Sequence, residues 1–193
     1  MSLCVIMGVS GSGKSTLMEG LLAWDPKATL LTSTTTRAPK PGDLSDKDGR
    51  YQEYRYVTKE EFEALESEGA FAWPAGPHGN RYGTPRSILD EALSTKRLYI
   101  AALVWDAVVA LKTYAAAHHP NAQISYVYLD LPDFKTREAR IKERGDTLES
   151  RKIRLAELPW KRQIEKARLT CLIIDAARPK HEVLTEAIKY LAK

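Results

Sequence analysis

The sequence predicts one α/β fold in which a parallel central sheet lies between two layers of helices, with an inserted lobe. Three observations predict it. Short apolar runs alternate with helical patterns along the chain, the first run is apolar at every position, and residues 33–84 depart from the alternation. An uninterrupted apolar run is typical of a strand buried on both faces, as in parallel sheets. The 193 residues suffice for one such fold but not for two independent domains.

The predicted elements follow in order from the N-terminus. Residues 3–7 (LCVIM) are the first strand, and residues 14–24 read as the first helix. Further strands are expected at 28–31, 98–104, 124–129 and 170–174, and further helices at 105–116, 133–144, 148–168 and 180–192. Strands that alternate with helices in this way predict a three-layer α/β architecture.

The segment 33–84 has a different composition. Glycine, proline and acidic residues separate short aromatic strands such as residues 53–57, and one helix is expected at 59–68. Thr58 followed three residues later by Glu61 forms a capping box, which marks the start of that helix. We therefore interpret this segment as a lobe inserted into the core.

Charge and hydropathy narrow the class of partner. The formal net charge of +4 is compatible with nucleic acid, a membrane surface or a phosphorylated ligand. The cations are spread along the chain, so we set nucleic acid aside. The longest apolar stretches are too short to cross a bilayer and no charged region precedes the first, which predicts a cytoplasmic protein. Cys4 and Cys171 lie in strand-like segments and are expected to be free core thiols.

Residues 8–15 (GVSGSGKS) match the G-x-x-x-x-G-K-[ST] pattern between a predicted strand and a predicted helix. Glycines allow successive backbone amides to face a β-phosphate, and the helix that begins near Lys14 adds the positive end of its dipole. Lys14 is expected to bridge the β- and γ-oxygens of ATP, and the Ser15 hydroxyl to hold Mg²⁺. A plain turn would not need lysine and serine at this offset. The predicted ATP-binding residues are Ser10, Gly11, Ser12, Gly13, Lys14, Ser15 and Thr16.

Downstream, residues 33–43 (STTTRAPKPGD) carry hydroxyls and two cations in a proline-stiffened loop, which suits an anionic acceptor. This run is similar to the S-[ST]-T-T-R-x-P-R-x-G-E segment of guanylate kinases. Residues 53–57 resemble that family's D-Y-x-F-V, and residues 78–84 its H-G-N-Y-Y-G-T. The motifs keep the family's order and, apart from a short insertion around 44–50, its spacing. The resemblance covers most of the chain.

The resemblance implies a P-loop NTPase fold and transfer of the γ-phosphoryl of ATP to a nucleoside monophosphate, with GMP or dGMP first. It implies a core of residues 1–32 and 85–193, an acceptor-binding lobe at 33–84 and a lid around 137–157. Arg37, Lys40, Tyr54 and Tyr82 would grip the acceptor's phosphate, and Lys40 stands where the family usually has arginine. The full set of expected acceptor-binding residues is Ser33, Arg37, Lys40, Tyr54, Trp73, Tyr82 and Thr84.

The charged lid carries the remaining expected catalytic residues. Residues 140–145 (RIKERG) resemble the family's R-L-x-x-R-G, and residues 154–155 its later R-L. Arginines on a closing lid would neutralise charge on the transferring phosphoryl group. The alternative interpretation of this charged run is a helix face that is exposed to solvent. The expected catalytic set is Lys14, Arg37, Arg140, Arg144 and Arg154.

The sequence departs from the family where the guanine base is read. The glutamate of G-E-F-L-E-W is replaced by Trp73, and two acidic positions of the following strand become Ala102 and Val104. Each base donor left unpaired costs ~1–3 kcal/mol. The acceptor is therefore open: GMP, ribose 1,5-bisphosphate or another nucleotide. Trp73 is read as pocket lining or as a core aromatic.

Other roles remain open as well. Asp106 is either a helix cap or a substitute for the missing acids near Mg²⁺, and His78 is read as a loop residue. A hypothesis from a different functional class is a non-catalytic, guanylate-kinase-like interaction module. Such modules usually lack the P-loop lysine, which this chain has as Lys14. ATP and a small phosphorylated acceptor are the expected partners of a monomer or homodimer.

Overall fold

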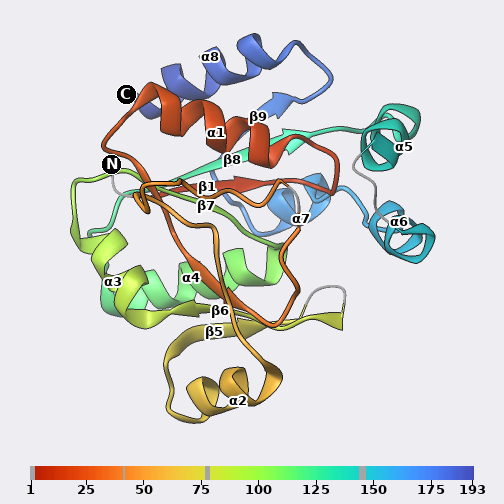
Figure 1. The fold of residues 1–193 in the computed structure, drawn as a ribbon. Coiled ribbons are helices and arrows are strands. Elements are labelled where there is room, and N and C mark those ends of the chain that lie inside the picture. The colour runs from red at the N-terminus through yellow and green to blue at the C-terminus, as the bar shows by residue number, and fades with distance from the viewer. Residues whose placement is uncertain (1–2, 41, 77–78, 144–146) are drawn as a thin grey trace.

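The computed structural model describes residues 3–40, 42–76, 79–143 and 147–193. Its central sheet has the order β2-β7-β1-β8-β9, and every neighbouring pair is parallel (Figure 1). The strands are β1 (Leu3–Met7), β2 (Thr29–Leu30), β7 (Tyr99–Ala102), β8 (Ile124–Asp130) and β9 (Leu172–Asp175). The predicted α/β fold with a parallel central sheet is confirmed.

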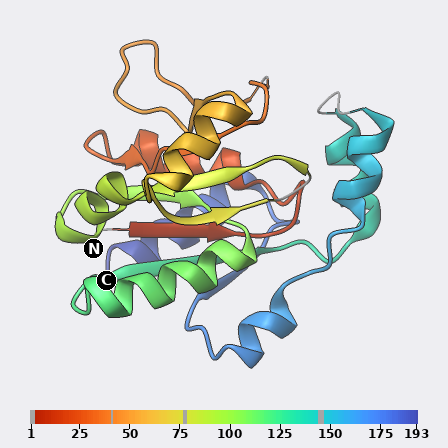
Figure 2. The ribbon, with the colours of Figure 1, turned by 90° about the horizontal axis from the view of Figure 1, so that it is seen from below.

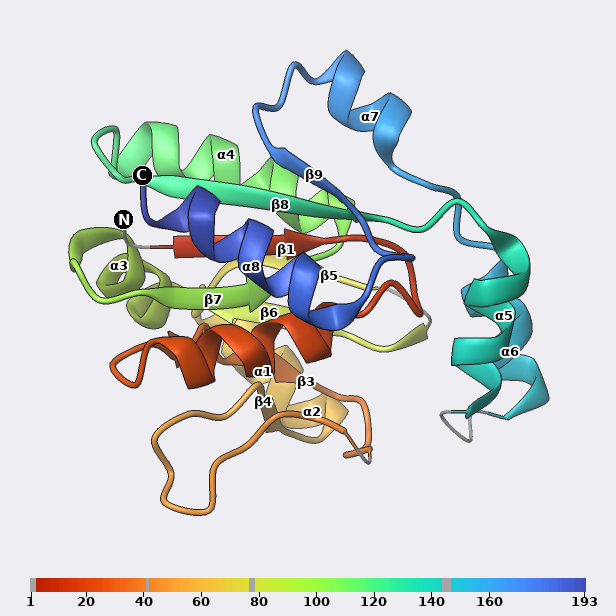
Figure 3. The same cartoon turned by 90° about the horizontal axis from the view of Figure 1, so that it is seen from above.

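Helices cover both faces of this sheet. On one face lie α1 (Lys14–Trp24) and α8 (Lys180–Leu191), and on the other lie α3 (Arg86–Ser94) and α4 (Trp105–His118) (Figures 1 and 3). Side chains of a strand point alternately to the two faces. Accordingly Leu3, Val5 and Met7 of β1 pack in the cluster that contains α3 and α4, while Cys4 and Ile6 pack in the cluster that contains α1 and α8. The fully buried β1 leads straight into the glycine-rich loop.

A second, four-stranded sheet has the order β4-β3-β6-β5. Its strands are β3 (Ser33–Thr35), β4 (Tyr54–Tyr56), β5 (Phe71–Ala75) and β6 (Tyr82–Pro85), and α2 (Lys59–Ser67) precedes β5. The Thr58 hydroxyl accepts a hydrogen bond from the Glu61 amide at 3.1 Å, so the predicted capping box is confirmed. β5 packs against α4, which holds this sheet beside the core.

Two helices lie outside the layers that cover the central sheet, at one end of the molecule. They are α5 (Phe134–Glu143) and α6 (Leu148–Leu155), and all three views place them beyond the carboxyl end of β8 (Figure 2). In open parallel sheets ligands bind outside the carboxyl ends of the strands. The glycine-rich loop of residues 8–15, called the P-loop below, follows β1 at this same end.

The single helix predicted at 148–168 is wrong. The chain forms α6, then a non-helical break at 156–160, then α7 (Lys161–Lys166). Pro159 explains the break, because proline lacks an N–H and disfavours a helical conformation in the residue before it. Residues 33–35 form β3 instead of the expected loop, and α3 is an additional helix beyond those that the sequence predicts.

The remaining expectations concern thiols and membranes. Cys4 is fully buried in β1, and Cys171 is half-buried just before β9; both are free. Within the described ranges, no helix combines the length and apolar character needed to span a bilayer.

Candidate active site

A cavity of about 1540 Å³ lies between the P-loop, the second sheet and α5 and α6. Every described member of the expected catalytic, ATP-binding and acceptor-binding sets lines it; Arg144 and His78 lie outside the described residues. The predicted residues that line it are Ser10, Gly11, Ser12, Gly13, Lys14, Ser15, Thr16, Ser33, Arg37, Lys40, Tyr54, Trp73, Tyr82, Thr84, Arg140 and Arg154. Residues far apart in the chain thus face one space.

The P-loop backbone has positive φ at Gly8, Gly11 and Gly13, a conformation that side chains rarely adopt. Gly8 has φ 147°, and a Cβ there would lie 2.6 Å from Ser12 Oγ and 2.8 Å from the Leu129 carbonyl oxygen. Gly13, the N-cap of α1, has φ 95° and no side chain with which to cap the helix. The first amides of α1, which begins at Lys14 as predicted, therefore suit an anionic ligand.

One buried hydroxyl in the loop has no partner in the part of the chain that the structure describes. Ser12 is 2% exposed, and its Oγ makes no hydrogen bond with any residue that the structure describes. Leaving such a group unsatisfied costs ~1–3 kcal/mol. A phosphate oxygen bound in the loop would satisfy it, so the loop fits a nucleotide's phosphates.

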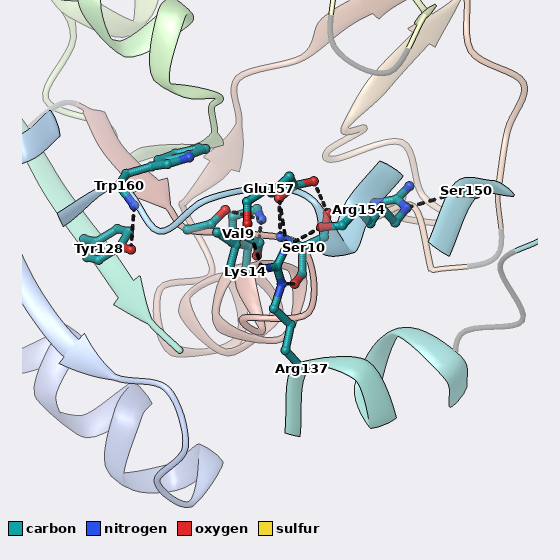
Figure 4. Close-up of polar contacts among 10 residues, drawn as sticks. Val9, Ser10, Lys14, Tyr128, Arg137, Ser150, Arg154, Glu157 and Trp160 are labelled. Atoms are coloured by element: carbon teal, nitrogen blue, oxygen red, sulfur yellow. Dashed lines mark hydrogen bonds and ion pairs between the residues drawn. The ribbon is translucent and has the colours of Figure 1, made fainter. Parts of the chain in front are cut away.

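Lys14 lies across the loop. Its Nζ donates to the carbonyl oxygens of Gly8 at 2.8 Å and Val9 at 3.1 Å (Figure 4). These contacts place the ammonium on the wall of the cavity, next to the loop that would hold the phosphates.

At the second sheet, Arg37 is held by the partly buried carboxylate of Asp43. Arg37 Nη2 donates to Asp43 Oδ1 at 2.7 Å, and Tyr56 OH donates to Asp43 Oδ2 at 2.6 Å. Burial opposes the charged form, but hydrogen bonds from Arg37, Tyr56 and the Lys40 amide prevail and lower the pKa of Asp43 below its ordinary value. Asp43 therefore stays ionised and fixes the guanidinium.

Arg37 and Lys40 form a cationic wall of the cavity, and aromatic rings pack beside it. The Arg37 guanidinium lies 4.9 Å from the centre of the Tyr54 ring, and the Tyr54 and Tyr82 rings meet edge to face at 5.9 Å. Glu53, which the sequence did not single out, also lines the cavity; its carboxylate accepts from the Leu44 amide at 3.0 Å, and burial raises its pKa.

The positions that depart from the family pattern share an apolar wall. Trp73 is only 7% exposed and packs edge to face on Tyr114 at 6.4 Å, yet part of it lines the cavity, so it is both core and pocket wall. Ala102 and Val104 line the same cavity. Asp106 is exposed at the start of α4 and does not line it.

Arginines from α5 and α6 face the P-loop. Arg140 Nη1 donates to the Gly11 carbonyl at 3.4 Å and Nη2 to the Ala176 carbonyl at 3.0 Å. Arg154 Nη1 donates to Ser10 Oγ at 3.1 Å. These contacts hold both helices against the loop.

Two residues at the loop were missed in the sequence. Arg137 and Glu157 both contact Ser10, across separations of 127 and 147 residues (Figure 4). A signal existed for Arg137, because it precedes the buried Ile141 by four residues and therefore shares its face of α5. Nothing local marked Glu157.

The fold and the cavity define a P-loop kinase architecture: a parallel sheet, a phosphate loop, a second sheet with a cationic wall, and arginine-bearing helices at the mouth. Residues 1–189 match the family model described as guanylate kinase. The chain belongs to the guanylate kinase family.

Individual guanylate kinases are similar to this chain in sequence. The guanylate kinase of Bordetella pertussis is 37% identical over 142 residues, which are 73% of this chain and 60% of that protein. That of Ralstonia nicotianae is 34% identical over 144 residues, which are 75% of this chain and 60% of that protein. The chain thus spans 60% of the length of each of these curated relatives.

Solved structures share the fold. A guanylate kinase from Anaplasma phagocytophilum superposes with a TM-score of 0.63 at 20% identity, covering 98% of this chain and 84% of that one. A gluconokinase from Sinorhizobium meliloti gives a TM-score of 0.51 at 18% identity, covering 99% and 91%.

Proposed function

We propose that the protein transfers the γ-phosphoryl group of ATP to the phosphate of a nucleoside monophosphate, with GMP and dGMP as the first candidates. The observation that carries the proposal is the common cavity, in which a P-loop faces a second cationic wall and two helix arginines. Phosphoryl transfer needs two anions held close together, and this geometry supplies a site for each. Membership of the guanylate kinase family supports the same reaction.

On the donor side, the loop amides and Lys14 would hold the β- and γ-phosphates. Ser15 would be the protein ligand of Mg²⁺, which commonly binds through substrate phosphates and keeps several waters. The described residues contain no group of three or more histidine, cysteine or acidic side chains that could hold a metal, and Ser15 with ATP phosphates does not need one. When bound, Mg²⁺ would neutralise charge on the phosphates.

On the acceptor side, Arg37, Lys40, Tyr54 and Tyr82 would bind the acceptor's phosphate. Lys40 offers a point charge where an arginine would offer a two-pronged fork, which weakens that contact. Arg140 and Arg154 would neutralise the transferring group, and α5 and α6 would exclude water from it. Positioning and charge suffice, so the reaction requires no general base.

A second candidate is a relative reaction with a different acceptor. The apolar wall of Trp73, Ala102 and Val104 offers no side-chain acceptor for the N–H groups of guanine. This wall favours an acceptor that does not need them, such as ribose 1,5-bisphosphate or another nucleotide. The orphan Ser12 hydroxyl and Lys14 argue against a non-catalytic interaction module, because both suit a bound nucleotide.

Release of ADP tests the function directly. With ATP and Mg²⁺, ADP should form only when a phosphorylated acceptor is added, and a panel of GMP, dGMP, other nucleoside monophosphates and ribose 1,5-bisphosphate ranks the acceptors by kcat/KM. A rate that no acceptor raises above the rate with ATP alone would refute the proposal.

Further expectations accompany this function. The division into a core, an acceptor lobe at 33–84 and a lid around 137–157 is part of the proposal, and the four-stranded sheet and the separate position of α5 and α6 support it. A cytoplasmic location and a monomeric or homodimeric state stay predictions.

A further inference from the structure

An acidic side chain lies against the phosphate loop. Glu157 belongs to the non-helical break between α6 and α7. Its Oε2 accepts from the Ser10 amide at 2.7 Å, and its Oε1 accepts from the Ser10 hydroxyl at 2.6 Å (Figure 4). One carboxylate thus satisfies both donors of a residue that is only 6% exposed.

A buried guanidinium holds the opposite side of Ser10. Arg137, 5% exposed, donates from Nε to the Ser10 carbonyl at 3.2 Å and from Nη1 to the Glu157 carbonyl at 2.8 Å. Its Nη2 donates to the Arg154 carbonyl and lies 3.9 Å from Glu157 Oε2. Arg137 therefore joins the P-loop, the end of α6 and the break in one network.

The Ser10 hydroxyl connects this network to Arg154. It donates to Glu157 and accepts from Arg154 Nη1 at 3.1 Å, while Arg154 Nε donates to Ser150 Oγ at 3.3 Å. A hydroxyl that gives its proton to a carboxylate presents its lone pairs to the guanidinium. The direction of the Glu157 bond thus determines where Arg154 lies over the loop.

We propose that Glu157 is a positioning residue which, supported by Arg137, fixes Arg154 against the P-loop through Ser10. The proposal rests on the proposed function. Hydrogen bonds to ionised groups are short and strong, so the network holds the arginine in place before the reaction begins. A cation that is already held in place stabilises the charge that develops in the transition state, because no free energy is needed to order it at that point.

A double-mutant cycle tests this coupling. At saturating ATP and acceptor, Glu157→Ala is expected to lower kcat about 10- to 100-fold with a smaller change in the KM for ATP. This is less than the roughly 100- to 1000-fold cost of removing a preorganised donor, because Arg154 is misplaced but still present. In an Arg154→Ala background the same substitution should change kcat less than about threefold, because the residue it positions is absent. Equal factors in both backgrounds would overturn the proposal. A lower KM for ATP at unchanged kcat would also overturn it, since the carboxylate would then compete with the nucleotide.

Conservative and control variants separate positioning from folding. Glu157→Gln keeps an oxygen for the Ser10 amide and should recover part of the kcat lost in Glu157→Ala. Glu165→Gln, on the exposed side of α7, is the matched control and should leave kcat within about twofold. If Glu157→Ala does not fold, Ser10→Ala carries the test, because it removes the connecting hydroxyl and should likewise be non-additive with Arg154→Ala.

Hydrogen exchange separates this proposal from the proposed function. In the ligand-free protein, Glu157→Ala should speed exchange of the Ser10 amide and of α6, and Glu165→Gln should not. Wild-type protein without acceptor-dependent turnover would refute the function, and unchanged exchange in Glu157→Ala would refute the positioning role, whatever the turnover.

Discussion

The apolar wall of the acceptor site predicts that guanine recognition can be installed. The perturbation is Trp73→Glu together with Ala102→Asp and Val104→Asp, which returns carboxylates to the three positions where the family pattern has acids. Each base donor that gains a partner is worth ~1–3 kcal/mol, or about 5- to 150-fold in kcat/KM for GMP. We expect a gain in this range.

The structure also gives the cost. Trp73 is 7% exposed, so removing the indole should destabilise the fold by ~3–5 kcal/mol, the usual loss for a buried large aromatic side chain. Val104 is the N-cap of α4 and makes no side-chain cap, so aspartate there should restore ~1 kcal/mol. The triple variant is therefore expected to fold with a clearly lower melting temperature.

Parallel ADP-release assays with GMP and ribose 1,5-bisphosphate measure the effect. Trp24→Glu, at a tryptophan that is 42% exposed on α1, is the matched control and should leave the preference between the acceptors unchanged. A folded triple variant with no gain toward GMP would show that these positions do not face a base, and would refute the assignment of this wall.

Three further predictions concern single residues. Lys14→Ala should lower kcat at least about 100-fold with little change in melting temperature, while Lys161→Ala on exposed α7 should not; equal turnover in the two would contradict the role of Lys14. The lowered pKa of Asp43 implies stability that is present above the carboxyl's unfolded pKa and is lost as pH falls through its folded pKa, so Asp43→Asn should flatten the acid limb of a stability–pH curve; an unchanged acid limb would count against the Arg37 pair. Burial raises the pKa of Cys4 to about 12, so the native protein should resist alkylation there at pH 8, and rapid labelling, followed by mass spectrometry, would contradict the packing of β1.

What the sequence predicts well is local. The P-loop, the start of α1 at Lys14 and the capping box of α2 depend on residues within a few positions of one another, so their patterns are legible without the fold. The buried first strand is equally clear, because β1 is apolar at every position and buried at every position. Such segments predict a parallel sheet, but not the order β2-β7-β1-β8-β9 of its strands, which depends on pairing between distant parts of the chain.

The sequence predicts less well the features that depend on long-range contacts or on a weak local signal. The charge pattern after residue 147 resembles that of one amphipathic helix. Pro159 is the local signal that this segment forms two helices. Helix α3 had a readable signal, since Leu89, Ala92 and Leu93 recur at helical spacing after a proline. The contact of Glu157 with Ser10 joins segments that no local pattern relates, so only the fold reveals it.

The central claim is that one cavity holds a nucleotide and a second phosphorylated ligand at the same time. Thermal unfolding with a non-hydrolysable ATP analogue, with each acceptor of the panel, and with both together tests it most directly, because only ligands that prefer the native state raise the melting temperature. The account predicts that the analogue and one acceptor together raise it beyond either alone. A melting temperature that the pair leaves no higher than the better single ligand would contradict it.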